Sequence, residues 1–151
     1  MNLPKMLFLD ANILIGAALG TRAPALIGAY AGEVWLCAPP VAFDDARRHL
    51  DLIGAKREWN TERQLAAMAA MDATAVLVQS IEEETYQVER AEALLRIGSR
   101  DPGDWPIVAT ALALGSPIWT QDRDFFGIGI ATWTTDRVEL YLSDDRPTPL
   151  A

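Results

Sequence analysis

The sequence predicts an α/β fold, a three-layer α/β/α sandwich with a mostly parallel central sheet. Three observations lead to this fold class. Short apolar runs typical of buried strands alternate with stretches of helical periodicity. The chain has 151 residues, of which 50% are hydrophobic, which suits one domain with a sizeable core. Aspartates follow the predicted strands, where open α/β sheets bind ligands. We expect one domain over residues 1–143 and a short tail over residues 144–151.

The first strand is predicted at residues 6–10, where an apolar run leads into Asp10. A run without polar interruption is typical of a strand buried on both faces. Residues 11–19 then show a helical pattern, so Asp10 lies between strand and helix. It can cap that helix or contribute to a site beyond the strand, and the sequence leaves both roles open. The next strand is predicted over residues 34–38.

A helix is predicted to begin near Pro40 and to continue to about Ile53. A rotation of about 100° per residue places Asp45 on the inner face and Asp44 opposite it. The residues expected to share that inner face are Val41, Ala42, Ala46, Leu52 and Ile53. A carboxylate there needs a partner, either a metal ion or a buried arginine. His49, the only histidine, is expected near the same face as a half-buried residue.

Two helices and one strand are predicted in the middle of the chain. The helices cover residues 60–71 and 81–97, and the strand covers residues 74–78. Ser80 and Glu83 have the spacing of a capping box that opens the second helix. The glutamates of this segment are therefore expected to be structural.

A further helix is predicted to begin at Asp104 as its cap, with Pro106 in its first turn. A helix that began at Pro102 would place Pro106 where an internal hydrogen bond is lost. Residues 101–103 then form the preceding turn. Gly115 supplies the C-terminal end of this helix.

The last predicted strands cover residues 116–120 and 131–134. Asp122 and Asp124 follow the first of them, again at a strand's carboxyl end. The tryptophans of apolar strands are expected in the core: Trp35, Trp119 and Trp133. Trp105, which follows the predicted helix cap, is a weaker candidate for stacking on a nucleic-acid base.

Four aspartates thus occupy ends of strands or inner faces of helices: Asp10, Asp45, Asp104 and Asp122. Carboxylates that converge repel one another by on the order of 1 kcal/mol or more unless a cation lies between them. We therefore predict a divalent-metal site for Mg²⁺ or Mn²⁺, ions that prefer carboxylate oxygens.

The chain resembles the PIN domain family over nearly its whole length. Residues 9–14 resemble the opening motif of the family, and residues 45–50 resemble its second acidic helix. The most specific likeness is in residues 104–112 followed by residues 119–125. Two positions differ from the usual pattern. The second acid is usually glutamate and is here Asp45, one methylene shorter, and Gln121 stands where glycine is common.

The resemblance implies a metal-dependent nuclease that acts on single-stranded RNA, in many members as the toxin of a toxin–antitoxin pair of the VapC type. Bound Mg²⁺ or Mn²⁺ would activate water and neutralise phosphate oxygens, so no side-chain nucleophile is required. The residues expected to bind metal and to be catalytic are Asp10, Asp45, Asp104 and Asp122. Supporting roles are expected for Asn12, Asp101, Thr120 and Asp124, and substrate contacts for Arg48 and Arg123.

Composition sets further expectations. The net charge of -8 opposes binding to a polyanion, so bound metal or a homodimer that joins two grooves would have to assist RNA binding. An acidic surface also suits a basic partner, such as an antitoxin tail. The single cysteine, Cys37, fits a reducing cytoplasm. No apolar run has the length of a membrane span, so the sequence predicts a cytoplasmic protein without membrane association.

Two other classes of protein remain open. A magnesium-dependent phosphohydrolase or receiver domain also uses acids at strand ends, but Lys5 and Lys56 are poor candidates for its lysine, and residue 12 is asparagine where the hydrolase motif has a second aspartate. A PIN scaffold that has lost catalysis and acts as a binding module is the other alternative, given Asp45 and the acidic surface.

Overall fold

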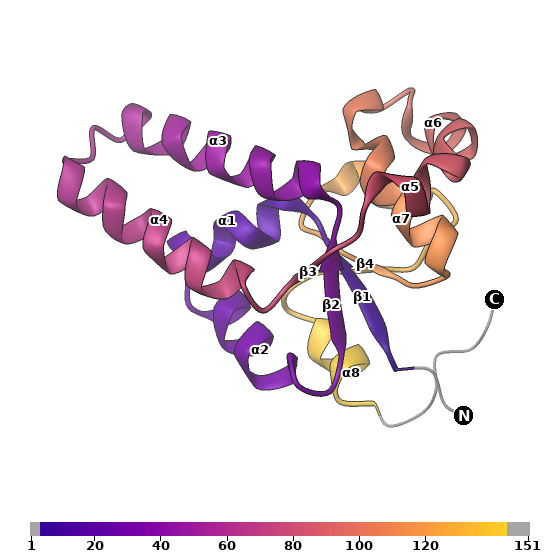
Figure 1. The fold of residues 1–151 in the computed structure, drawn as a ribbon, viewed down its shortest axis with the longest axis horizontal. Coiled ribbons are helices and arrows are strands. Elements are labelled where there is room, and N and C mark those ends of the chain that lie inside the picture. Colours follow the sequence, from indigo (N-terminus) through magenta and orange to yellow (C-terminus); the bar gives the residue numbers. More distant parts are fainter. Residues whose placement is uncertain (1–3, 145–151) are drawn as a thin grey trace.

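A computed structural model describes residues 4–144 and contains a five-stranded parallel sheet in the order β3-β2-β1-β4-β5 (Figure 1). The strands are β1 (Met6–Leu9), β2 (Trp35–Ala38), β3 (Gln79–Ser80), β4 (Ile118–Trp119) and β5 (Thr132–Trp133). Helices cover both faces of this sheet, which confirms the predicted fold class. The predicted tail from residue 145 onward lies outside the described residues.

The helices form two layers that pack on opposite faces of the sheet (Figure 1). One layer contains α1 (Ala11–Leu19), α2 (Arg22–Tyr30), α3 (Pro40–Lys56), α4 (Thr61–Ala75) and α8 (Val138–Leu142). The other contains α5 (Glu83–Tyr86), α6 (Arg90–Ile97) and α7 (Trp105–Leu114). Short 3-10 helices cover Gln87–Glu89 (η1), Pro102–Asp104 (η2) and Arg123–Phe125 (η3).

Alternation along β1 divides the core between these two layers. Leu7 and Leu9 pack with α1, α3 and α4, whereas Phe8 packs with α6 and α7. All three side chains are fully buried, as expected for a strand covered on both faces. The order of the strands reverses between β1 and β4, so the carboxyl ends of these two strands flank a topological switch point.

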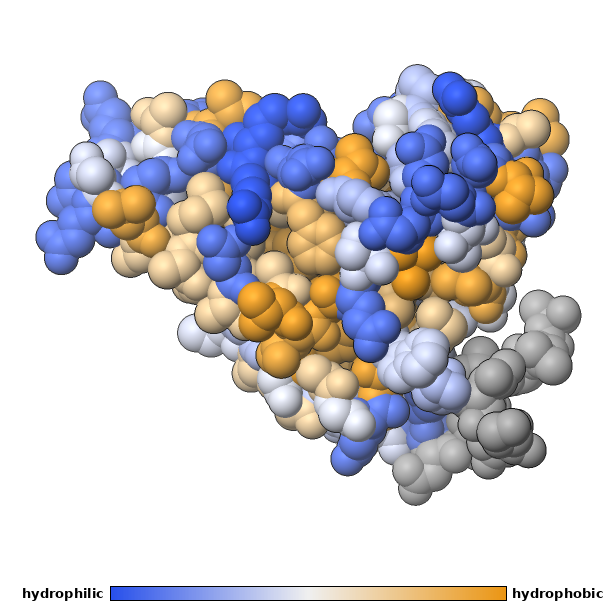
Figure 2. Space-filling model, viewed as in Figure 1, coloured by the Kyte–Doolittle hydropathy of each residue, from blue (hydrophilic) through white to orange (hydrophobic). Residues whose placement is uncertain are grey.

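The strand predicted at residues 74–78 is wrong, because α4 continues to Ala75. Ala67, Met71 and Thr74 are all buried, so the helical spacing of inward residues persists through the segment. Val76 and Leu77 are exposed in the following turn, where Figure 2 shows an apolar patch. The strand itself is the shorter β3.

The helix predicted at residues 81–97 is broken into α5, η1 and α6, and the predicted capping box is wrong. Ser80 belongs to β3, and the backbone N–H of Ile81 donates to Ala38 O at 2.9 Å. The sheet therefore holds this segment extended. The helix starts later, after Glu82, whose side chain makes no capping hydrogen bond.

The inner face of α3 differs from the predicted one. Ala42, Ala46, Leu50 and Gly54 are buried, whereas the side chains predicted to lie inside include two that are exposed, Val41 (37%) and Leu52 (60%). His49, expected to be half-buried, is exposed. Small residues form the inner face because α3 packs closely on α1 and α4.

The tryptophans also depart in part from expectation. Trp119 is fully buried and Trp133 packs against the core, but Trp35, predicted as core, is 47% exposed. Trp35 is the first residue of β2 and lies beyond the cover of the helices. Two helices, α2 and α8, were not predicted; α2 buries Ala23, Leu26 and Ile27 at helical spacing.

Among the described residues no single helix is long and apolar enough to cross a membrane. The pair α1 and α2 meets the length and composition criteria only in combination, and the two helices meet at a bend of 110°.

Candidate metal centre

The centre is built around Asp10, at the carboxyl end of β1 beside the switch point. Its Oδ1 accepts from the backbone N–H of Ala11 at 2.7 Å, so Asp10 does cap α1. Its Oδ2 accepts from Thr120 Oγ1 at 2.8 Å and from Asn12 Nδ2 at 3.0 Å. Capping thus uses one carboxylate oxygen, while the other faces the end of β4.

Asn12 and Thr120 lock the ends of β1 and β4 together around Asp10. Thr120 Oγ1 accepts from the backbone N–H of Asp122 at 2.9 Å while donating to Asp10. Asn12 Oδ1 accepts from the backbone N–H of Gln121 at 3.3 Å. Asp122 Oδ1 in turn accepts from the backbone N–H of Asp124 at 2.9 Å. This hydrogen bond caps the start of η3. These bonds fix the backbone from which both later acids project.

Asp104 enters the same region from the start of α7, but not as the predicted side-chain cap. Its carboxylate makes no capping hydrogen bond. Asp101 instead caps the preceding turn η2 by accepting from the N–H of Gly103 at 3.0 Å. Asp104 Oδ2 is buried and has no hydrogen-bond partner among the described residues. A buried carboxylate oxygen without a partner is costly and calls for an explanation.

Burial and mutual repulsion raise the pKa of two of these carboxyls. Burial, followed by the charge of Asp10 and then those of Asp101, Asp122 and Asp124, raises the pKa of Asp104 to about 7. Burial, together with the charges of Asp122 and Asp45, raises the pKa of Asp10 to about 6. The hydrogen bonds from Thr120 and Ala11 act in the opposite direction and lower this pKa. Asp10 therefore lies within electrostatic reach of the other three predicted acids, Asp45, Asp104 and Asp122.

One part of the cluster is especially tight. Carboxylate oxygens of Asp101, Asp104 and Asp124 all lie within 4.8 Å of one another. Asp101 and Asp124 were expected in supporting roles, and the structure places them as close to Asp104 as possible metal ligands would lie. The donors are all carboxylate oxygens, and Asp104 carries a buried oxygen without a partner among the described residues, so the residues present fit a hard divalent cation such as Mg²⁺ or Mn²⁺.

Asp45, whose charge acts on Asp10, is half-buried, whereas Asp44 is exposed. The Oδ1 atom of Asp45 accepts a hydrogen bond from Arg48 Nη2 at 2.6 Å. Arg48, expected to contact substrate, is thus engaged with Asp45, while Arg123 is exposed on η3. Asp45 thus has an arginine partner, but an exposed one and not the buried arginine that the sequence left open, and its charge also acts on Asp10.

Trp105 has both an aromatic and a cationic neighbour. Its ring centroid lies 5.6 Å from that of Tyr86, and the Arg90 guanidinium lies 5.0 Å from it. These contacts occupy part of the ring that the sequence suggested for stacking on a base.

Neither lysine of the chain binds the acidic cluster. Lys5 donates to the carbonyl oxygens of Tyr141 and Asp144, and Lys56 is exposed at the end of α3.

Arg100 is a contributor that the sequence did not identify. Its Nη1 donates to the carbonyl oxygens of Asp124, at 2.7 Å, and of Phe126. No local sequence pattern predicts this contact, because it joins the turn after α6 to η3 and to Phe126, the residue that follows η3.

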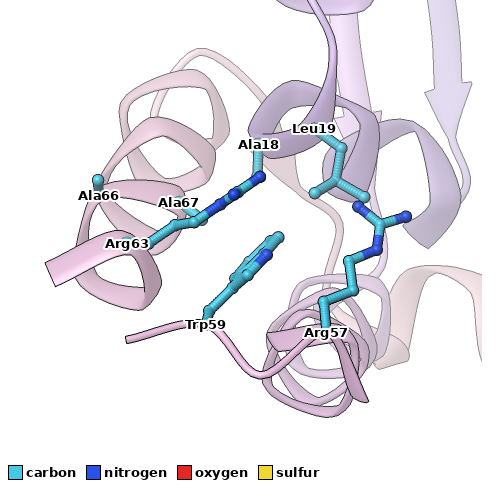
Figure 3. Close-up of a pocket in the computed structure, with 7 residues that line it drawn as sticks. All are labelled: Ala18, Leu19, Arg57, Trp59, Arg63, Ala66 and Ala67. Carbon is cyan, nitrogen blue, oxygen red and sulfur yellow. The ribbon is translucent and has the colours of Figure 1, made fainter. Parts of the chain in front are cut away.

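A pocket of about 270 Å³ lies elsewhere, near the turn between α3 and α4 (Figure 3). Trp59 lies at its centre between Arg57 and Arg63, with Leu19 across the opening. Its lining residues are Ala18, Leu19, Arg57, Trp59, Arg63, Ala66 and Ala67. No acid lines it, so it is separate from the metal centre.

Comparison with known proteins agrees with the fold. Similar solved structures include PAE2754 from Pyrobaculum aerophilum, with a TM-score of 0.70, 17% identity, and coverage of 92% of this chain and 90% of that chain. VapBC2 from Rickettsia felis, bound to a promoter DNA fragment, has a TM-score of 0.64 and 11% identity, with coverage of 85% of this chain and 98% of that chain. FitAcB from Neisseria gonorrhoeae has a TM-score of 0.63 and 17% identity, with coverage of 86% of this chain and 98% of that chain.

Because the identities are low, these comparisons show a similar fold only. No curated protein matches the sequence. The family itself follows from the sequence match: a family model described as PIN domain matches residues 8–143. That range begins within β1 and ends after α8, and it includes every acid of the metal centre. The chain therefore belongs to the PIN domain family.

Proposed function

We propose that this protein is an endoribonuclease that uses Mg²⁺ or Mn²⁺ to hydrolyse phosphodiester bonds of single-stranded RNA. Members of the PIN domain family are generally nucleases, and the match covers the whole candidate centre. The observation that carries the proposal is Asp104 Oδ2, a buried oxygen without a partner among several carboxylates. Such an arrangement is unfavourable without a cation and favourable with one.

The chain's own residues suit the task of holding metal rather than of attacking phosphorus. The metal, when bound, would supply an activated water and neutralise the phosphate oxygens. Asp10, Asp104, Asp122 and Asp124 would hold it, with Asp101 adjoining and Asp45 at the margin. Asn12 and Thr120 orient Asp10. Cys37 is buried and burial raises its pKa to about 11, so it is unsuited to act as a nucleophile.

Cleavage of end-labelled single-stranded RNA tests the proposal directly. Wild type is expected to cleave in Mg²⁺ or Mn²⁺ and to stop in chelator. Asp10→Asn and Asp104→Asn should abolish most cleavage, while Asp44→Asn, which removes an exposed charge from α3, serves as the matched control. Cleavage that persists undiminished in both site variants would contradict the assignment.

We further propose that the protein is the toxin of a toxin–antitoxin pair and acts as a homodimer. Support comes from the likeness to VapBC2 and FitAB structures, each determined with DNA, and from the net charge of -8, which suits a basic partner segment. Expression should arrest growth, and Asp104→Asn should relieve the arrest. Co-expression of the neighbouring open reading frame should relieve it as well, and sedimentation of the purified protein should give the mass of two chains.

A second candidate function is a PIN scaffold that binds without catalysis. The ion pair between Asp45 and Arg48 favours it, because it gives this carboxylate a partner within the chain in place of a metal ion. Asp45→Glu separates the two candidates. If the short side chain limits metal reach, glutamate should increase cleavage; if the centre is a scaffold, neither protein should cleave while both still bind RNA.

A further inference from the structure

The loop that carries Asp124 has an unusual attachment to the neighbouring helix. Residues 123–130 follow β4, and two arginines from the α6 region bind their carbonyl oxygens. Arg100 Nη1 donates to Asp124 O and Phe126 O. Arg96 Nη1 donates further along, to Ile128 O at 3.2 Å and Gly129 O at 3.4 Å. The two contacts divide the loop into a part beside the acids and a part beyond them.

Arg100 differs from Arg96 because it lies next to two acids of the metal centre. It immediately precedes Asp101, and its side chain binds the backbone of Asp124. A single residue therefore joins the two chain segments that supply Asp101 and Asp124 to the tight cluster around Asp104. Arg96, by contrast, pairs with Glu92 at 2.9 Å and reaches only residues beyond the cluster.

Arg100 acts on the backbone rather than on the charge of the cluster. Its recorded hydrogen bonds go to carbonyl oxygens and not to a carboxylate. The acids keep their mutual repulsion, since carboxylate oxygens of Asp101, Asp104 and Asp124 lie within 4.8 Å of one another. Repelling carboxylates must be held together by something other than their own contacts.

We propose that Arg100 is a positioning residue for the metal centre: by binding the carbonyls of residues 124 and 126, it holds the Asp124 carboxylate against Asp101 and Asp104. The guanidinium fork suits this role, because its donors are rigidly arranged and its charge is permanent. This inference rests on the proposed function, since it gives Arg100 a part in binding the metal that the nuclease requires.

Calorimetric titration with Mn²⁺ in the absence of RNA tests the inference without measuring activity. Arg100→Met is expected to raise the dissociation constant for Mn²⁺ by about 10-fold or more, as loss of a group that supports a ligand does. Arg96→Met, the control at the arginine of α6 that binds the same loop, should change this constant by no more than about twofold, the scale of an independent site. Equal dissociation constants for wild type and Arg100→Met would overturn the inference.

A double-mutant cycle distinguishes positioning from general destabilisation. If Arg100 acts through Asp124, then Arg100→Met should have no further effect on Mn²⁺ affinity once Asp124 is replaced by Asn. Additive losses would show that Arg100 does not act through Asp124. Should Arg100→Met fold poorly by circular dichroism, Arg100→Lys, which keeps the charge and one possible donor, replaces it, with an intermediate loss expected.

The same titrations separate this inference from the proposed function. A wild type that binds no Mn²⁺ would contradict the metal-dependent nuclease itself. A wild type that binds Mn²⁺ and cleaves RNA, with an unaltered dissociation constant in Arg100→Met, would contradict only the role of Arg100.

Discussion

At the scale of single residues, the decisive feature is one carboxylate oxygen, Asp104 Oδ2, that the fold buries without a donor among the described residues. Asp10 and Asp104 both have a raised pKa, but their surroundings differ. Asp10 accepts three hydrogen bonds, from Ala11, Asn12 and Thr120, whereas Asp104 Oδ2 accepts none from residues 4–144. Asp104 is therefore the position where adding or removing a cation should matter most for the folded state.

Stability in chelator should depend on pH in a direction opposite to that of ordinary paired carboxylates. The folded pKa is about 6 for Asp10 and about 7 for Asp104, against 3.8 for the unpaired group. Between these values the unfolded chain has lost protons that the folded chain keeps, so raising the pH favours unfolding. Their contribution is complete below pH 3.8 and is lost as the pH rises through 6 and 7.

Urea unfolding in chelator across this pH range measures the effect. The free energy of unfolding of wild type should fall as pH rises, and the fall should be smaller in an Asp10→Asn and Asp104→Asn double variant. Excess Mn²⁺ should reverse the trend for wild type, because metal binds the ionised form. A free energy that rises with pH in chelator would contradict the isolation of these two carboxyls.

Replacing Asp104 by asparagine should stabilise the protein without metal. Asparagine keeps the shape and removes the repelled charge, so we expect a gain of about 1 kcal/mol in chelator, a modest value because the residue is partly exposed and solvent screens it. Thermal scans of both proteins, repeated with excess Mn²⁺, provide the measurement. A variant that melts well below wild type in chelator would mean that Asp104 is mainly structural, as a paired buried carboxylate would be.

The acids could be predicted from sequence because each occupies a position fixed by its own segment. Asp10 and Asp122 follow short apolar strands, and Asp104 precedes a helix whose start is marked by Pro106. Their partners could not be predicted in the same way. Which of Asp101 and Asp104 caps the turn depends on a local geometry that both could adopt, and the contact of Arg100 with residue 124 depends on tertiary packing.

At the scale of elements, α3 shows how a helix can present one of two adjacent acids to a site. Asp45→Asn is expected to weaken Mn²⁺ binding and reduce cleavage, since Asp45 is half-buried and acts on Asp10. Asp44→Asn should leave both within about threefold, the scale of an exposed charge. Metal titration and RNA cleavage on the two variants give the comparison, and an equal effect of both would mean that Asp45 does not face the centre.

The end of α7 offers a test of folding that leaves the site untouched. Gly115 has φ 66° and ψ 40°, and its N–H donates to Ala111 O at 2.8 Å. A side chain is disfavoured in this left-handed conformation, so Gly115→Ala should lower the free energy of unfolding by about 1 kcal/mol. Mn²⁺ affinity should stay unchanged, because the helix start that carries Asp104 is at the other end; a loss of affinity would show that the two ends are coupled.

Elements with local end signals were predictable, and elements shaped by the sheet were not. Asn60 caps α4 through its side chain, Pro40 opens α3, and Gly115 ends α7, as each sequence pattern indicates. Ser80 carries a helix-start pattern as well, yet pairing with β2 keeps it extended. A two-residue strand such as β3 has too few residues to show an alternation of its own, so only its neighbours reveal it.

At the scale of the whole molecule, the surface charge makes RNA binding depend on the bound cation. A net charge of -8 repels a polyanion, and the arginines near the acids are partly engaged: Arg48 with Asp45, and Arg100 with loop carbonyls. Fluorescence polarisation with labelled single-stranded RNA should show weaker binding in chelator than in Ca²⁺, used here to occupy the centre without Mg²⁺ or Mn²⁺. Equal affinity in both would place the RNA on a surface away from the acids.

The hydrogen bond between Thr120 and Asp10 joins residues 110 positions apart, and this has a consequence for the chain while it is being made. β1 has only β2 as a neighbour until β4 is added on its other side. Asp101, Asp104, Asp122 and Asp124 are all translated after the first hundred residues. A nascent chain on the ribosome therefore lacks most of the carboxylates of the centre until residues 101–124 have left the exit tunnel, so synthesis itself delays the appearance of the site.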